Sequence, residues 1–130
     1  MVKISIVGDR GEYSGPLTKY AIKNVIKTVN NPICIVFDWI GEFALLEKEL
    51  SEDLIVIKDR LNFSKIRIDK NYRNEIIHKV KYYDYTIILL DASHLNDLEE
   101  KEAFEDLEIF SKELQNIKKR NVYLFFHKAS

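Results

Sequence analysis

The sequence is poor in the residues that cross-link or interrupt a chain, because its 130 residues include one cysteine, two prolines and four glycines. A single cysteine excludes an internal disulfide, and with it the disulfide-stapled folds of small secreted proteins. No apolar run approaches the ~20 residues that span a bilayer, and the N-terminus lacks a basic segment followed by an apolar one. We therefore expect a cytoplasmic protein without membrane contact.

An excess of charge of one sign is also lacking, since 20 basic residues stand against 21 acidic ones and the net charge is -1. No overall positive field would draw the chain onto nucleic acid, so direct charge-driven binding to DNA or RNA is not expected. The length suits one domain that buries roughly two thirds of the surface its unfolded chain exposes. No repeat, low-complexity segment or linker divides residues 1–130, which predicts a single domain.

The sequence is rich in short runs of branched apolar residues. The run at 85–91, Tyr-Thr-Ile-Ile-Leu-Leu-Asp, lacks period-2 alternation and predicts a central strand covered on both faces. Helical and strand patterns alternate along the chain, which predicts a three-layer α/β domain with a mainly parallel sheet and helices on both faces. The other predicted strands are 2–7, 33–37, 54–58, 65–69 and 122–126, and the predicted helices are 16–29, 41–50, 71–81 and a last one from 96 to about 117.

Two of the predicted helices have clear starts. Gly15 and Pro16 suit the beginning of the first helix, since Pro is tolerated where the backbone N–H has no partner anyway. Asn96 and Glu99 have the spacing of a capping box, which predicts where the last helix begins. The expected core-facing residues are Leu17, Ala21, Ile22, Val25, Ile26 and Val29 in the first helix, and Ala103, Leu107, Phe110, Leu114 and Ile117 in the last.

Polar residues follow several of the predicted strands. Asp38 and Asp91 each end an apolar strand, His94 comes three residues later, and His127 follows the last strand. The carboxyl ends of parallel strands share one edge, where open sheets of this kind bind ligands, so Asp38, Asp91 and His94 are the candidate catalytic groups. The alternative is that each carboxylate caps the turn or helix after it. An O/N metal site that also used His127 has no short ligand spacing behind it, so no metal is predicted.

The order of these motifs resembles the HerA/FtsK group of P-loop ATPases, and the similar segments span nearly the whole chain, although the family's ATPase domain is longer. The resemblance implies a P-loop NTPase-like or Rossmann-like fold, with ATP and Mg²⁺ held at Gly8, Gly11, Ser14 and Asp91. The segments are Gly8-Asp9-Arg10-Gly11, Asp38-Trp39-Ile40-Gly41-Glu42-Phe43, Ile87-Ile88-Leu89-Leu90-Asp91-Ala92-Ser93-His94, and Lys118-Lys119-Arg120-Asn121 with the strand that follows.

The glycine loop departs from the family pattern. A working P-loop reads G-x-x-x-x-G-K-[ST], because backbone amides wrap the phosphates, the lysine neutralises them and the hydroxyl holds Mg²⁺. With Gly8 as the first glycine, Tyr13-Ser14-Gly15 take the places of the second glycine, the lysine and the hydroxyl. Asp9 and Glu12 add carboxylates that would repel phosphate. ATP and Mg²⁺ are therefore doubtful ligands of this loop.

The segment around Asp91 and the last strand also depart from the family pattern. Ala92 takes the place of the carboxylate that would polarise the attacking water, and His127 takes the place of an amide sensor. Phosphoryl transfer relies almost wholly on positioned charge, so losing these groups together predicts a degenerate relative with little route to phosphoryl transfer.

We therefore expect a non-catalytic interaction or regulatory module whose partner is a protein, either a second copy of itself or a DNA-processing ATPase. Two alternatives stay open. One is a nucleotide or small-ligand sensor that uses the loops after the strands. The other is a metal-dependent phosphoesterase or nuclease that uses Asp38, Asp91 and His94. Cys34 lies within an apolar run and is expected to be a small core residue without a nucleophilic role.

Overall fold

The computed structural model describes residues 2–8, 14–38, 54–57, 69–93, 95–118 and 121–129. The predicted helix at 41–50 and all but the last residue of the predicted strand at 65–69 lie outside these ranges. In the described part of the chain, strands and helices follow one another as β1 (Val2–Gly8), α1 (Ser14–Thr28), β2 (Pro32–Phe37), β3 (Leu54–Ile57), α4 (Lys70–Val80), β4 (Tyr85–Asp91), α5 (Asp97–Lys118) and β5 (Val122–Ala129).

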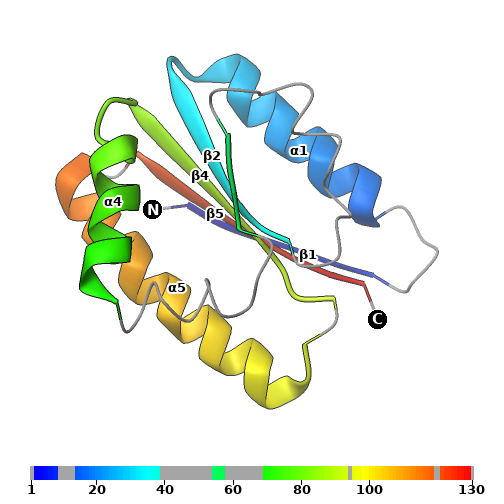
Figure 1. Ribbon diagram of the computed structural model, residues 1–130. Coiled ribbons are helices and arrows are strands. Elements are labelled where there is room, and N and C mark those ends of the chain that lie inside the picture. Colours follow the sequence, from blue (N-terminus) through cyan, green and yellow to red (C-terminus); the bar gives the residue numbers. More distant parts are fainter. Residues whose placement is uncertain are drawn as a thin grey trace.

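The five strands form one sheet in the order β1-β5-β4-β2-β3, and every neighbouring pair is parallel. Parallel neighbours cannot be joined by a tight turn, so the chain crosses over the sheet between strands. The last strand, β5, lies between β1 and β4, so the first and last strands run side by side, with the two ends of the chain at opposite ends of this strand pair (Figure 1).

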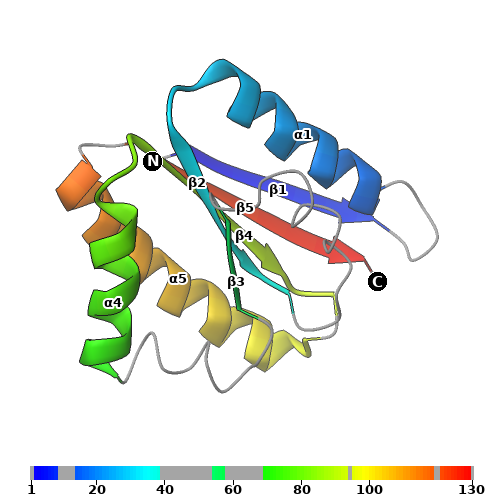
Figure 2. The same ribbon diagram turned by 45° about the horizontal axis from the view of Figure 1, so that its top comes forward.

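Helices cover both faces of the sheet: α1 lies on one face, and α4 and α5 lie on the other (Figures 1 and 2). The predicted three-layer α/β domain with a parallel sheet is therefore confirmed. None of the helices in the described ranges has the length and apolar character needed to cross a lipid bilayer.

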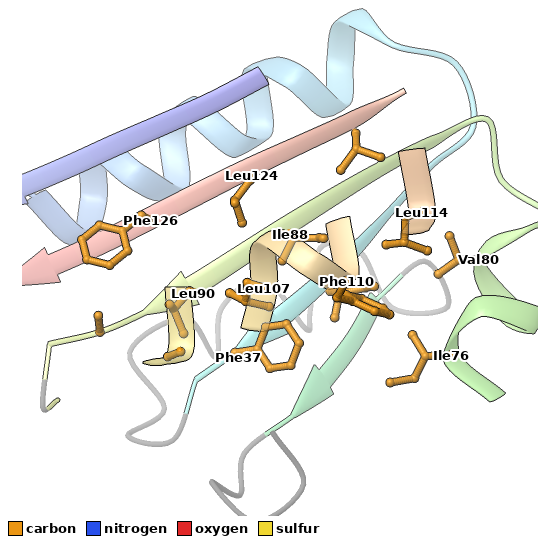
Figure 3. Close-up of a cluster of buried hydrophobic side chains, with 14 of the residues drawn as sticks. Phe37, Ile76, Val80, Ile88, Leu90, Leu107, Phe110, Leu114, Leu124 and Phe126 are labelled. Atoms are coloured by element: carbon orange, nitrogen blue, oxygen red, sulfur yellow. The ribbon is translucent and has the colours of Figure 1, made fainter. Parts of the chain in front are cut away.

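The sheet separates two hydrophobic clusters, and β4 contributes to both. Ile88 and Leu90 pack beneath α4 and α5, whereas Ile87 and Leu89 pack beneath α1 with Ile22. Figure 3 shows the larger cluster, in which side chains of β2, β4 and β5 meet those of α4 and α5. All of these β4 side chains have no exposed surface, which confirms the strand predicted at 85–91 as a central one.

Helix α5 begins with the predicted capping box. The Glu99 backbone N–H donates to Asn96 Oδ1 at 2.9 Å, and the Asn96 N–H donates to Glu99 Oε1 at 3.2 Å. The predicted inward residues from Ala103 to Leu114 are buried. Ile117 is the exception, because it is 48% exposed in the last turn of the helix.

Helix α1 differs from the sequence prediction at its start and on its inward face. The helix begins at Ser14, so Pro16 is its third residue, still within the turn whose N–H groups need no helical partner. Leu17 is 53% exposed, and Thr18 is buried in its place. The inward stripe runs through Thr18, Ile22 and Val25, the i, i+4, i+7 spacing of one helix face, and the periodicity of apolar residues alone could not select it.

We expect Phe110→Ala to lower the free energy of unfolding by about 3–5 kcal/mol, because it opens a cavity between α5 and the sheet. The neighbouring Ile109 is 60% exposed, so Ile109→Ala should change stability by less than about 0.5 kcal/mol. Urea denaturation of both variants measures the difference. Equal losses for the two variants would contradict the placement of α5.

Candidate functional site

Three polar side chains lie side by side in neighbouring strands near the carboxyl edge of the sheet. Asp91 of β4 is in register with His127 of β5, and Phe37 is in register with Leu90, which puts Asp38 beside Asp91. All three are buried. We call Asp38, Asp91 and His127 the polar row.

The polar row faces α1. Side chains alternate along a strand, and the residues next to Asp91 and His127, namely Leu90 and Phe126, belong to the cluster beneath α4 and α5. Asp91 and His127 therefore point to the opposite face. Figure 3 shows Leu90 and Phe126 on the α5 side of their strands.

The strongest contact of the polar row joins two residues that are 36 positions apart in sequence. His127 Nδ1 lies 3.1 Å from Asp91 Oδ1, and the side chains of both residues are almost fully buried. Burial alone would raise the pKa of Asp91, but hydrogen bonds from His127 and Ser93 lower it, and the net result is a pKa below the usual carboxyl value. An ionised carboxylate only accepts hydrogen bonds, so Nδ1 of His127 carries the hydrogen.

The two oxygens of Asp91 have different surroundings. Oδ1 also accepts from the Ser93 hydroxyl at 2.6 Å and from the Ser93 N–H at 3.2 Å. Oδ2 is buried and has no hydrogen-bond partner among the described residues. A buried carboxylate oxygen without a donor or cation is costly, so Asp91 presents an acceptor that a ligand could use.

The first turns of α1 lie over this edge of the sheet. Thr18 is buried and lies one turn before Ile22, which packs on β4 and β5, so Thr18 lies closer than Ile22 to the carboxyl ends of the strands. Thr18 is a residue of the site that the sequence did not reveal. The available signal was its place on the same helical face as Ile22 and Val25, but a lone threonine among apolar residues gives no reason to prefer that face.

Ala92 lies on the other side of the sheet from the carboxylate before it. Its side chain is buried in the cluster beneath α5, beside Leu95, and its N–H donates to the His127 carbonyl at 2.8 Å. A side chain at this position points away from the polar row, and Ala carries no polar group in any case. The described residues thus provide a fixed carboxylate and no carboxylate next to it in sequence that could polarise a water.

The structure brings several of the predicted site residues to one edge. Gly8 ends β1 opposite Ala129, two positions past the level of His127, and Ser14 begins α1. Gly11 and His94 lie outside the described residues. His127 itself was placed after the last strand by the sequence prediction, and this was wrong, because β5 continues to Ala129. Pairing with β1 as far as Gly8 extends the strand beyond its apolar run.

Metal and thiol chemistry receive no support within the described ranges. No three His, Cys, Asp or Glu side chains gather there closely enough to hold a metal ion. Cys34 is buried, and burial raises the pKa of its thiol to about 12, so it is protonated and inert at neutral pH. Its predicted role as a small core residue is confirmed.

A groove of about 540 Å³ lies on the opposite face of the sheet, between the outer strand β1 and the first half of α5. Ser5, Phe126 and Phe104 line it together with charged side chains of α5. Phe126 points away from His127 across the sheet, so this groove is separate from the polar row.

The chain matches no known protein family and no curated protein. Its fold is similar to a solved structure of the pCW3 conjugation coupling protein TcpA, a monomer form with ATPgS, at a TM-score of 0.52 and 13% sequence identity. The similarity covers 98% of this chain and 42% of the coupling protein chain, so our chain spans less than half of its neighbour. The similarity therefore shows a shared α/β fold over nearly the whole of this chain.

The lowered pKa of Asp91 predicts a stability change in acid. The contribution is complete above about pH 4, the usual carboxyl value, and is lost as the pH falls through the lowered pKa. At pH 7, Asp91→Asn should lower the free energy of unfolding by about 1.5–3 kcal/mol, because charge-assisted hydrogen bonds are lost. The difference from the unmodified protein should shrink below about pH 4.

Denaturant titrations across this pH range measure the effect, and Glu102→Gln on the exposed surface of α5 serves as the control. This control should match the unmodified protein at every pH. A difference for Asp91→Asn that stayed constant into strong acid would contradict the prediction.

Proposed function

We propose that this chain is a non-catalytic interaction or regulatory module built on a P-loop-ATPase-like fold, and that its partner is a protein, either a second copy of itself or a DNA-processing ATPase. The observation that carries the proposal is the position of Ala92. The resemblance requires a carboxylate there to polarise water, and the alanine packs into the apolar core beneath α5.

The start of α1 supports the same proposal. In a working P-loop the lysine and the Mg²⁺-binding hydroxyl stand at the beginning of this helix. Here the first four residues of the helix are Ser14-Gly15-Pro16-Leu17, and the first lysine, Lys19, follows more than a turn later. The helix therefore offers its backbone dipole to an anion but no cation in its first turn.

The contact of His127 supports the proposal as well. The resemblance implies that Asp91 would assist Mg²⁺, but one oxygen of this carboxylate already accepts a hydrogen bond from His127. Oδ1 of Asp91 accepts from His127 and Ser93, so this oxygen has a structural role within the sheet. Fold similarity alone does not carry an activity from one protein to another, and catalytic groups must be present in the site itself.

We expect the purified protein to hydrolyse Mg²⁺-ATP no faster than a buffer blank, because Ala92 follows Asp91 and the first turn of α1 contains no lysine. A coupled phosphate-release assay makes the measurement on the unmodified protein, Asp91→Asn and Glu102→Gln. Hydrolysis that Asp91→Asn abolishes and Glu102→Gln leaves intact would overturn the proposal.

A second candidate, a nucleotide or small-ligand sensor, is favoured by one observation: Oδ2 of Asp91 is buried and without a partner among the described residues. A ligand donor or a hydrated cation at this oxygen would satisfy it, and the N-terminus of α1 would favour an anionic group nearby. Such a sensor would bind without hydrolysis.

Thermal melting with ATP, ADP or inorganic phosphate, each with and without Mg²⁺, tests the sensor. A ligand at about 100 times its dissociation constant should add about 2.7 kcal/mol to the free energy of unfolding. Asp91→Asn should abolish that gain if the ligand uses Oδ2, and Glu102→Gln should keep it. If none of these ligands changes the melting temperature at millimolar concentration, the chain is not a sensor of nucleotides or phosphate.

A further inference from the structure

Strand β1 is the outer strand of the sheet that the described residues form, and we call its outer side the open edge. It pairs with β5 on one side, and no strand in the described ranges pairs with its other side. Lys3, Ser5 and Val7 are exposed, whereas the residues of the central strand β4 from Thr86 to Asp91 are buried. An open edge presents unpaired backbone N–H and C=O groups that can bind another strand.

This edge lacks the features that usually prevent strand pairing. β1 contains no proline, and its one charged residue, Lys3, forms an ion pair with Glu108 of α5. Val7, near the end of the strand, is 67% exposed. An edge strand of seven residues with one charged side chain and no proline is a favourable template for pairing with another strand.

Helix α1 extends the open edge of β1 on one face of the sheet. It contacts both β5 and β1, and in Figures 1 and 2 it runs along β1 with no other labelled element beyond it. Because crossovers between parallel strands are right-handed, the flank of α1 that carries Leu17, Asn24 and Thr28 faces the open edge. All three are exposed, whereas Lys19 and Lys23 on the opposite flank are half-buried.

The outer flank of α1 and strand β1 together form a surface with few charged residues for this protein. Charged residues make up 32% of the sequence, yet Leu17, Asn24 and Thr28 are neutral and the charge of Lys3 is paired. Tyr20, 64% exposed, lies at the outer margin of this flank. Two copies of such a surface can meet without like charges opposing each other, which is the condition for a self-complementary interface.

We propose that β1 and the outer flank of α1 bind a second copy of this chain, with the two β1 strands paired antiparallel about a two-fold axis at Ser5. The two sheets then join into one. Because α1 contacts both β1 and β5, we take its axis to lie about half a strand spacing inside β1, which brings the two helix axes roughly 10 Å apart, close to the 8–10 Å at which helices pack. The two α1 flanks meet on one face of the joined sheet.

A second copy fits this surface better than a single strand from another protein. A lone strand would pair with β1 but leave Leu17 and Tyr20 in water. A second copy brings its own α1 with its own β1, so it covers the edge and the flank together. Both elements are roughly 22 Å long, which lets the strand and helix contacts form over the same length.

This inference adds the contact surface to the proposed role as an interaction module, and it rests on that role only for its choice of a protein partner. It requires neither nucleotide binding nor its absence. The polar row lies at the carboxyl edge of the sheet, whereas the proposed dimer surface lies along its side. A hydrolysis assay therefore tests the proposed function, a measurement of mass tests the dimer, and either proposal can be wrong without the other.

Light scattering during gel filtration of the full chain tests the dimer. At about 100 μM we expect a mass of twice the 15.3 kDa of one chain, corresponding to a dissociation constant at or below about 10 μM. Val7→Lys should give a monomer, since it places a lysine opposite Lys3 of the second copy. Leu17→Glu should also give a monomer, and its charge suits the first turn of a helix.

Leu98→Lys is the matched control, because Leu98 is as exposed as Val7 but lies on α5, outside the proposed surface of β1 and α1. It should remain a dimer. Circular dichroism melting checks that the variants are folded, and we expect them to fold because all three substituted side chains are exposed. A monomeric unmodified protein at about 100 μM, or a dimer that both Val7→Lys and Leu17→Glu leave intact, would overturn the proposal.

The register has its own test. In the proposed pairing Ser5 lies opposite itself at about 5 Å between Cα atoms, within the range that a disulfide bridges. Ser5→Cys should therefore form a covalent dimer with oxidised glutathione. In Lys3→Cys the two thiols would be four residues apart along the strands, about 13 Å, and no cross-link is expected. The native Cys34 is buried and should not react. Cross-linking of Lys3→Cys but not of Ser5→Cys would contradict the antiparallel register.

Discussion

Burial of β4 on both faces is the constraint on which the rest of the fold depends. Its side chains alternate between two hydrophobic clusters, so helices must cover each face: α1 over one, α4 and α5 over the other. The same burial surrounds Asp91 at the end of the strand. A carboxylate in that position must be hydrogen-bonded to remain ionised, and His127 and Ser93 supply the donors.

The polar row is thus part of the architecture as well as a candidate site. Its hydrogen bonds satisfy one oxygen of Asp91 and leave the other without a partner in the described part of the chain. The site has a fixed carboxylate under a helix N-terminus and an apolar residue, Ala92, directly after it, and the proposed binding or regulatory role rests on this pair of features. The distant similarity to a conjugation coupling protein supports the fold, and the activity has to be argued from these residues.

Helix α1 belongs to both surfaces that we consider functional. Its first turns, with the buried Thr18, lie over the polar row, and its outer flank continues the open edge of β1. The two surfaces differ in chemistry. The first is a row of buried polar side chains, and the second is a partly apolar strip for which we propose a second copy of the chain.

The sequence by itself determined the α/β class, the central strand at 85–91 and the capped start of α5, because these follow from local periodicity and from groups a few residues apart. It placed Asp38 and Asp91 at one edge for the same reason. It misjudged Leu17 and Ile117, since apolar periodicity does not show which flank of a helix the sheet covers. Only the tertiary structure decided that β5 enters between β1 and β4. That strand order brings His127 to Asp91 across 36 residues and makes β1 the outer strand among the described ones, because strand pairing depends on packing between distant segments.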